Sequence, residues 1–136
     1  MNVYEEDDGS IVTEKIYFVP DEDSHGISLH SSSGKGWYKN EKEHTWGSGT
    51  VMKYYAQGYF VWKNGTVSVS SPSGEVSNVP NSVTISNKKT ETGTGKYAGV
   101  FNNYAYVEFS FTATNMIGLD TDFSVAIRIS ESGNNI

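Results

Sequence analysis

The sequence predicts an all-β fold: a single-domain antiparallel β-sandwich of seven to nine short strands, with a small β-barrel as the alternative. Residues branched at Cβ, which favour pleated surfaces, are abundant, with 13 Val and eight Ile against two Leu. Several segments alternate apolar and polar residues, whereas none shows ten residues of helical periodicity. Gly, Asn, Ser and Pro separate these segments, as expected for turns between strands.

The length of 136 residues suits one domain, which we place over residues 11–130. Residues 1–10 are predicted to be a flexible acidic leader and residues 131–136 a tail. Residues 1–24 contain eight acidic residues and a single basic one, so the negative net charge of −6 arises in this part of the chain. An acidic segment with few apolar anchors is typically solvated, which is the basis for the flexible leader.

The N-terminal third of the domain gives weak strand signals. A first strand is predicted over residues 11–19, and it ends at Pro20 and an acidic turn. Residues 27–30 are a candidate for a short second strand. Residues 37–49 combine charges, two Trp and two Gly without a clear period, so they are expected to be irregular.

The strongest signal is a hairpin in the middle of the chain. Residues 50–62 place Met, Tyr, Ala, Gly, Phe and Trp at every second position, which predicts a half-buried strand. Asn64-Gly65 follows, and both residues tolerate the positive φ of a type I′ turn. Residues 66–70 are therefore predicted to return antiparallel to the first strand.

The C-terminal half predicts three more strands, over residues 82–87, 104–113 and 123–130. The segments between them are expected to be connections: a turn at 71–74, a polar loop at 88–95 and a loop at 114–122. The alternating apolar faces of these strands and of the hairpin should pack together as the core, which comprises Phe60, Trp62, Val107, Phe109, Phe111, Val125, Ile127 and Ile129.

Composition argues against several classes of function. The chain has no Cys, and Arg128 is its single Arg, so we expect no Cys-based metal site and no nucleic-acid binding. It has no apolar run long enough for a transmembrane helix. The spacing of His25, His30 and His44 does not suit zinc, and neither acidic cluster fits the EF-hand calcium loop. We predict no metal and no cofactor, with one alternative, a calcium site built from remote turn acids: Asp21, Asp23, Asp120 and Asp122.

The sequence contains no catalytic motif that stands out. With eighteen serines, a chance Ser/His/Asp combination carries no information, and the G-x-S-x-G motif is absent. Glu108 is the one acidic residue inside a strong strand, on its polar face. We therefore predict a protein that is not an enzyme and retain a hydrolase as the second alternative.

Aromatic residues provide the candidate binding surface. Flat amphipathic rings on exposed strand faces or loops suit a glycan or a protein ligand. The candidate binding residues lie in predicted loops or on the more polar strand faces: Trp37, Tyr38, Trp46, Tyr55, Tyr59, Tyr104 and Tyr106.

Three segments carry a resemblance to known proteins: FVWKNGTVSVSS at 60–71, YAYVEFSFTA at 104–113 and FSVAIRIS at 123–130. Their composition and strand rhythm resemble small uncharacterised secreted or surface β-proteins of Gram-positive bacteria. Trp46-Gly47-Ser48-Gly49 also resembles a short stretch of the lactococcin-type bacteriocins. The resemblance implies a secreted or cell-surface protein, and because no apolar signal segment is found near residue 1, we expect the mature form.

Together these observations predict an extracellular β-sandwich that binds a glycan or a protein. The alternative is a secreted antagonist or a membrane-active protein, of the pore-forming or bacteriocin-like kind, because long alternating hairpins rich in Ser and Thr can also line pores. The sequence makes no prediction of the oligomeric state.

Overall fold

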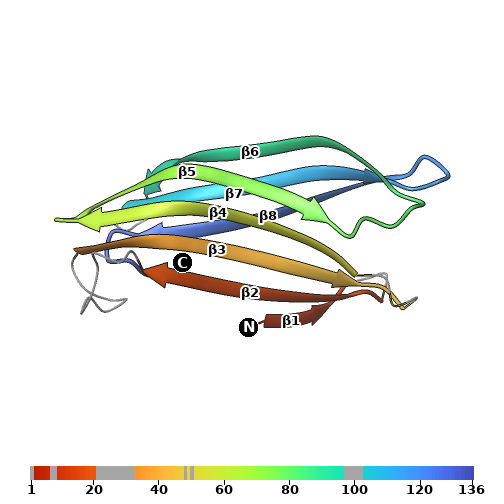
Figure 1. Cartoon of the computed structure of the whole chain (residues 1–136), viewed down its shortest axis with the longest axis horizontal. Helices are drawn as coiled ribbons and strands as arrows, with labels where there is room; N and C mark the ends of the chain where they lie inside the picture. The colour runs from red at the N-terminus through yellow and green to blue at the C-terminus, as the bar shows by residue number, and fades with distance from the viewer. Residues whose placement is uncertain (1, 7–8, 21–32, 48, 50, 97–102) are drawn as a thin grey trace.

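The computed structural model describes residues 2–6, 9–20, 33–47, 49, 51–96 and 103–136, and the candidate short strand at 27–30 lies outside them. The described residues form an elongated β-sandwich (Figure 1). A five-stranded sheet, which we term sheet A, packs against a three-stranded sheet, sheet B. The two sheets are separate, so the prediction of a sandwich is confirmed and the small-barrel alternative is wrong.

Within each sheet, strands that are consecutive in the sequence pair antiparallel. Sheet A contains β1 (Asn2–Glu5), β2 (Ile11–Pro20), β3 (Ser33–Thr45), β4 (Val51–Lys63) and β5 (Thr66–Ser77). Sheet B contains β6 (Thr84–Lys96), β7 (Asn103–Thr114) and β8 (Asp120–Ser130). Antiparallel neighbours need only short connections, which matches the turn-rich composition.

The predicted central hairpin is confirmed. Its strands are β4 and β5, joined by Asn64 and Gly65 with φ angles of 52° and 76°. Positive φ at both central residues is the mark of a type I′ turn, whose twist matches that of the flanking strands.

The core lies between the sheets and consists of the predicted apolar faces. Alternate residues of β4 from Met52 to Trp62 are buried, and those of β7 from Ala105 to Ala113 face them. The eight predicted core residues belong to one buried cluster, so the predicted core is confirmed. Gly58 and Gly74 allow close packing here, because a Cβ atom on Gly74 would lie 2.5 Å from the Cβ of Phe109.

Four local predictions are wrong, because strands form without an alternating apolar pattern. Residues 2–5 of the predicted leader form β1, which pairs with β2. The predicted irregular segment 37–49 lies largely in β3, and the predicted loop 88–95 lies within β6. The predicted turn 71–74 lies within β5, where a shift in register opposite Gln57 and Tyr59 accommodates one extra residue.

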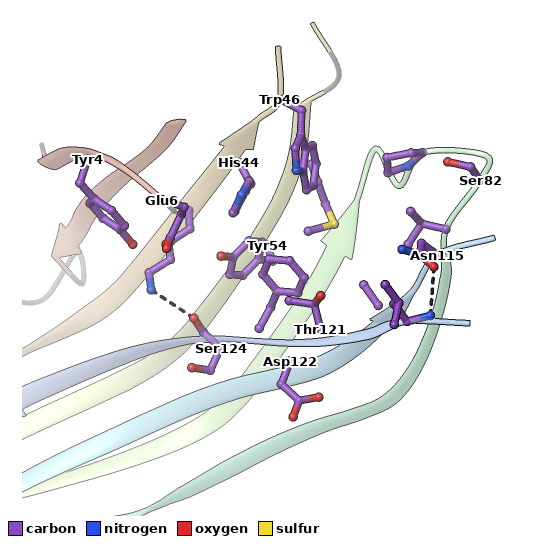
Figure 2. Close-up of a pocket in the computed structure, with 17 residues that line it drawn as sticks. Tyr4, Glu6, His44, Trp46, Tyr54, Ser82, Asn115, Thr121, Asp122 and Ser124 are labelled. Carbon is purple, nitrogen blue, oxygen red and sulfur yellow. Dashed lines mark hydrogen bonds between the residues drawn. The ribbon is translucent and has the colours of Figure 1, made fainter. Parts of the chain in front are cut away.

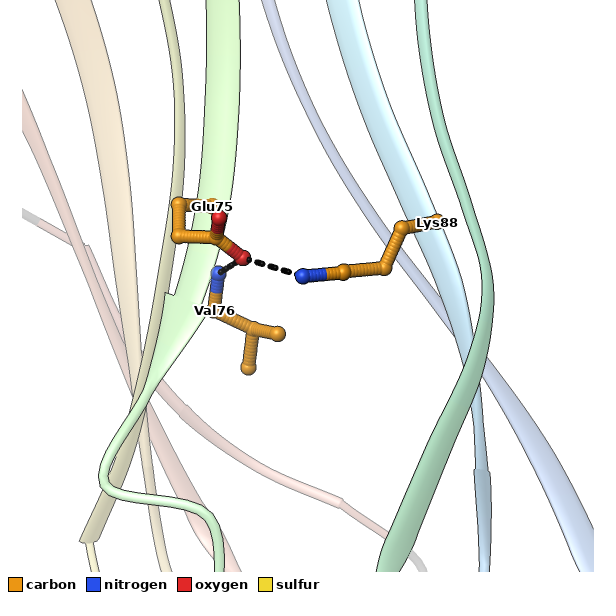
Figure 3. Close-up of polar contacts among 3 residues, drawn as sticks. All are labelled: Glu75, Val76 and Lys88. Carbon is orange, nitrogen blue, oxygen red and sulfur yellow. Dashed lines mark hydrogen bonds and ion pairs between the residues drawn. The ribbon is translucent and has the colours of Figure 1, made fainter.

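An ion pair joins the two sheets at the side where β5 passes beside β6 (Figure 3). The Nζ of Lys88 lies 3.0 Å from Oε1 of Glu75, which also accepts a hydrogen bond from the Val76 N–H. These hydrogen bonds hold the pKa of Glu75 below its usual value. At the opposite side, β1 and β2 extend the five-stranded sheet (Figure 1).

Candidate functional site

Three of the predicted binding residues come together on the outer face of sheet A. The burial of β4 alternates, so its odd-numbered residues, including Tyr55 and Tyr59, point away from the core. Trp37 of β3 is paired with Tyr59, and paired residues of antiparallel strands share a face. The rings of Trp37 and Tyr59 meet edge to face, with centroids 5.4 Å apart.

The strand register adds residues that the sequence did not single out. Tyr17 pairs with Lys39, and Lys39 pairs in turn with Gln57. The Lys39 ammonium lies 4.5 Å from the ring centre of Tyr55 and 5.9 Å from that of Tyr17, so it bridges two aromatic rings. We term this surface the aromatic platform; it comprises Tyr17, Val19, Trp37, Lys39, Glu41, Tyr55, Gln57 and Tyr59.

The aromatic platform is open to solvent and combines apolar with polar groups. Val19, Tyr17 and Trp37 keep 60%, 42% and 38% of their surface exposed. A surface depression of about 380 Å³ lies among its residues, within the usual range for binding sites. Lys39 also forms an ion pair with Glu41 at 3.4 Å, so the two charged groups of the platform offset each other.

Tyr38 is the candidate that the structure contradicts. It lies between Trp37 and Lys39 in a segment without a clear apolar period, yet its side chain is buried with 4% exposed. The ring packs 4.5 Å from that of Phe18, and its hydroxyl donates a 2.6 Å hydrogen bond to the Gly133 carbonyl. Burial raises its pKa to about 12. Tyr38 is therefore a core residue that connects sheet A to the C-terminal segment.

Tyr104 and Tyr106 lie on the outer face of sheet B, away from the aromatic platform. They pair with Gly95 and Gly93 of β6. A Cβ atom on Gly95 would lie 2.6 Å from the Tyr104 hydroxyl oxygen, and one on Gly93 would lie 3.1 Å from that of Tyr106. Each ring thus covers a glycine of the neighbouring strand, which gives both tyrosines a packing role.

Trp46 lines a separate cavity at the end of the sandwich where β3 meets β4 and β7 meets β8 (Figure 2). The cavity has a volume of about 790 Å³. Trp46 stacks on His44 with ring centroids 4.6 Å apart, and the rings of His44 and Phe123 are nearly perpendicular with centroids 5.4 Å apart. Sequence reasoning found Trp46 as a loop aromatic but had no signal for the cavity, because its walls come from both sheets.

Among the described residues, the Ser10 hydroxyl lies 2.5 Å from Nε2 of His44. Ser10 is 1% exposed and does not line the cavity. A nucleophile must reach its substrate, so this buried pair joins β3 to the segment before β2 and does not form a catalytic centre.

Within the described ranges, no group of three or more His, Asp or Glu side chains is arranged to hold a metal ion. Two of the candidate calcium ligands are described, and each accepts a hydrogen bond: Asp120 from Thr114 and Asp122 from Thr112. Asp21, Asp23, His25 and His30 lie outside the described residues.

Comparison with protein-family models, with curated proteins and with solved structures finds no match for this chain. Over the residues that the structure describes, no helix has the length and apolar character needed to span a membrane.

Proposed function

We propose that this protein is an extracellular binding module that holds a neutral glycan on the aromatic platform. The observation that carries this proposal is the exposure of Trp37 and Tyr17, with the half-buried Tyr55 beside Lys39, around the hydrogen-bonding groups of Lys39 and Gln57. A sugar ring has an apolar C–H face and a rim of hydroxyl groups. Aromatic rings can pack against the first, while amide, ammonium and carboxylate groups can bind the second.

The charges of the platform favour a neutral ligand over an acidic or basic one. Lys39 is paired with Glu41, so the depression has no excess of either sign. Both residues also lie on a central strand of sheet A, which fixes their positions. The extracellular location rests on composition: the chain is rich in Ser, Thr, Asn and Gly, and it has no Cys.

Affinity electrophoresis tests the proposal directly. The protein is run through native gels that contain xylan, hydroxyethylcellulose, glucomannan or soluble starch, beside a gel without polysaccharide. We expect at least one polysaccharide to retard the wild-type chain. Replacing Trp37 or Tyr55 with Ala should weaken that binding about ten-fold, since buried aromatic anchors dominate binding energies.

Tyr4→Ala is the matched control, because Tyr4 is also an exposed aromatic residue, at 40%, but lies outside the platform. It should bind like the wild type. Absence of retardation in all four gels, or full binding by Trp37→Ala, would contradict the proposal. A leakage assay on liposomes tests the membrane-active alternative: dye release by the wild-type chain would favour that function instead.

A further inference from the structure

The cavity at the end of the sandwich is independent of the aromatic platform and has two chemically different ends. One end is formed by Tyr4 and Glu6, with the buried Tyr54 beside them (Figure 2). The other end is bounded by Val83 and Leu119, which come from the β5–β6 and β7–β8 connections. Trp46 and its stacked partner His44 form a wall between the two ends.

The first end is aromatic and acidic. Figure 2 shows the hydroxyl of Tyr54 pointing to the side of the cavity where Glu6 lies. The electrostatic field agrees with this placement, because burial, followed by the negative charges of neighbouring groups including Glu6 and Glu14, raises the pKa of Tyr54. Burial and the same two carboxylates also raise the pKa of Tyr4. A positive charge placed here would therefore be stabilised.

Two other charged side chains line the cavity: Lys42, whose positive charge opposes that of Glu6, and Asp122. Lys42 directs its Nζ to the carbonyl oxygen of Ser124, at 3.2 Å. The carboxylate of Asp122 accepts a hydrogen bond from Thr112, its partner on β7. In Figure 2, Asp122 points away from Tyr54 and Glu6.

The second end combines the apolar Val83 and Leu119 with the polar Ser82 and Asn115, and it continues into an exposed apolar turn. Leu119, Met116 and Ile117 of the β7–β8 turn are 61%, 83% and 80% exposed. The turn is held by hydrogen bonds from the N–H groups of Ile117 and Leu119 to the Asn115 side chain. A ligand with an apolar portion would find a preformed contact surface here.

We propose that this cavity binds an organic cation, namely an ammonium or guanidinium group on an apolar stem, with the charge near Glu6 and the stem toward Leu119. The rings of Tyr4, Tyr54 and Trp46 can pack against such a group through cation–π contacts. The volume of about 790 Å³ is sufficient for a small amine or for a Lys or Arg side chain of a bound peptide.

The test is a titration of the ¹⁵N-labelled full chain followed by NMR, with the Trp46 indole N–H as the reporter. Three ligands of similar size are compared: 2-phenylethylammonium, neutral 2-phenylethanol and anionic 3-phenylpropionate. We expect the cation to bind most tightly and the anion most weakly. The peptides acetyl-Leu-Lys-amide and acetyl-Leu-Glu-amide form a second arm, and tighter binding of the Lys peptide than of the free amine would identify a protein as the source of the cation.

Two variants, one that removes a negative charge and one that removes a positive charge, should change binding of the cation in opposite directions. Glu6→Gln should weaken binding of the cation about five-fold and leave binding of the alcohol unchanged. Lys42→Met removes the opposing charge and should strengthen binding of the cation. Trp37→Ala, on the aromatic platform, is the matched control and should bind the amine like the wild type. Thermal unfolding of each variant verifies that it is folded.

Equal binding of the cation, the alcohol and the anion would overturn the proposal, as would an unchanged affinity in Glu6→Gln. Absence of any shift at the Trp46 indole with all five ligands would overturn it as well. None of these results bears on glycan binding, which is read from Trp37 and Tyr55 on another face.

Discussion

The side-chain amide of Asn40 on β3 donates a 2.8 Å hydrogen bond to the backbone carbonyl of Ala126 on β8. β8 is an edge strand of sheet B, and the carbonyl of Ala126 lies on its unpaired side. The same amide donates to Oε2 of Glu14 at 3.0 Å. An inward side chain of one sheet thus protects the edge of the other, where an unpaired strand would otherwise invite association.

Replacing Asn40 with Leu should lower the free energy of unfolding by about 1–3 kcal/mol. The side chain of Asn40 is buried, at 4% exposed, and its loss leaves the oxygen atoms that accept its hydrogen bonds without this donor. Urea denaturation measures this change. Asn81→Ala, at an exposed position, is the control and should change stability by less than about 0.5 kcal/mol. An equal change in the free energy of unfolding for the two variants would contradict the role of Asn40 in joining the two sheets.

Phe109→Ala should destabilise the fold by about 3–5 kcal/mol, since the ring is 2% exposed and packs directly over Gly74. The same denaturation experiment gives the value. Met116→Ala removes a side chain that is 83% exposed and should have almost no effect. A loss below about 1 kcal/mol for Phe109→Ala would place its ring outside the core.

Gly65→Ala should lower stability by about 1–2 kcal/mol, because a residue with a side chain is strained at a φ of 76°. Space is not the reason, since a Cβ atom at Gly65 would meet no other atom within 4 Å. Gly47 is equally open but has no positive φ, so Gly47→Ala is the matched control and should not be destabilised. Similar melting temperatures for the two variants would exclude the type I′ turn.

Tyr38 should make the fold sensitive to alkali. Its pKa is about 12 in the folded protein against 10.0 for an unperturbed tyrosine. Below pH 10 the hydroxyl of Tyr38 is neutral in both the folded and the unfolded chain, so it does not make stability depend on pH. Between pH 10 and 12 it ionises in the unfolded chain first, which lowers the free energy of unfolding by roughly 2 kcal/mol. Tyr38→Phe should be less stable than the wild type at pH 7, where it lacks the bond to Gly133, yet lose less stability above pH 10. Parallel stability curves for the two proteins would contradict this account.

Tyr106→Ala should destabilise the fold without affecting ligand binding, because the ring covers Gly93 on β6 and lies far in the fold from the aromatic platform. Restoring a side chain at the glycine provides the check: adding Gly93→Ala to Tyr106→Ala should recover part of the lost stability, since the added Cβ then meets no ring. Loss of glycan binding in folded Tyr106→Ala would instead assign the tyrosine to a binding site.

The strands that could be predicted from the sequence are those with one apolar face toward the core and one polar face toward solvent. β4 and β7 alternate strictly, so their burial follows from period two. β3 was missed because its inward positions include Gly34, Gly36 and Asn40, which supply no apolar side chain. The Phe18 ring lies against Gly36, and Asn40 forms hydrogen bonds. β6 was predicted only at its start, within residues 82–87, and its remainder was taken for a loop because most of its residues are exposed. Neither strand carries the pattern on which the prediction depends.

Of the aromatic platform, the sequence indicated Trp37, Tyr55 and Tyr59 but not the residues that join them. The surface near Trp37, Tyr55 and Tyr59 follows from the pairing of β3 with β4, which residue types alone do not specify. Once the register is known, Lys39 and Tyr17 necessarily join that surface. The same register turns Tyr38 inward, because adjacent residues of a strand point to opposite faces. The sequence thus indicated which residue types form a binding surface, whereas the register determined which of them meet.

The strictly sequential order of strands has a consequence for how this chain folds. Apart from β2 and β3, the strands of each hairpin are joined by connections of at most six residues, so the entropic cost of forming either sheet is low for an all-β protein. The contacts between the sheets are the long-range ones, such as those of Gly58 with Val107 and of Gly74 with Phe109. We therefore expect the hairpins to form early and the docking of sheet B onto sheet A to limit the folding rate. Core substitutions on either inner face should then slow folding, whereas changes at the turns should chiefly alter the formation of individual hairpins.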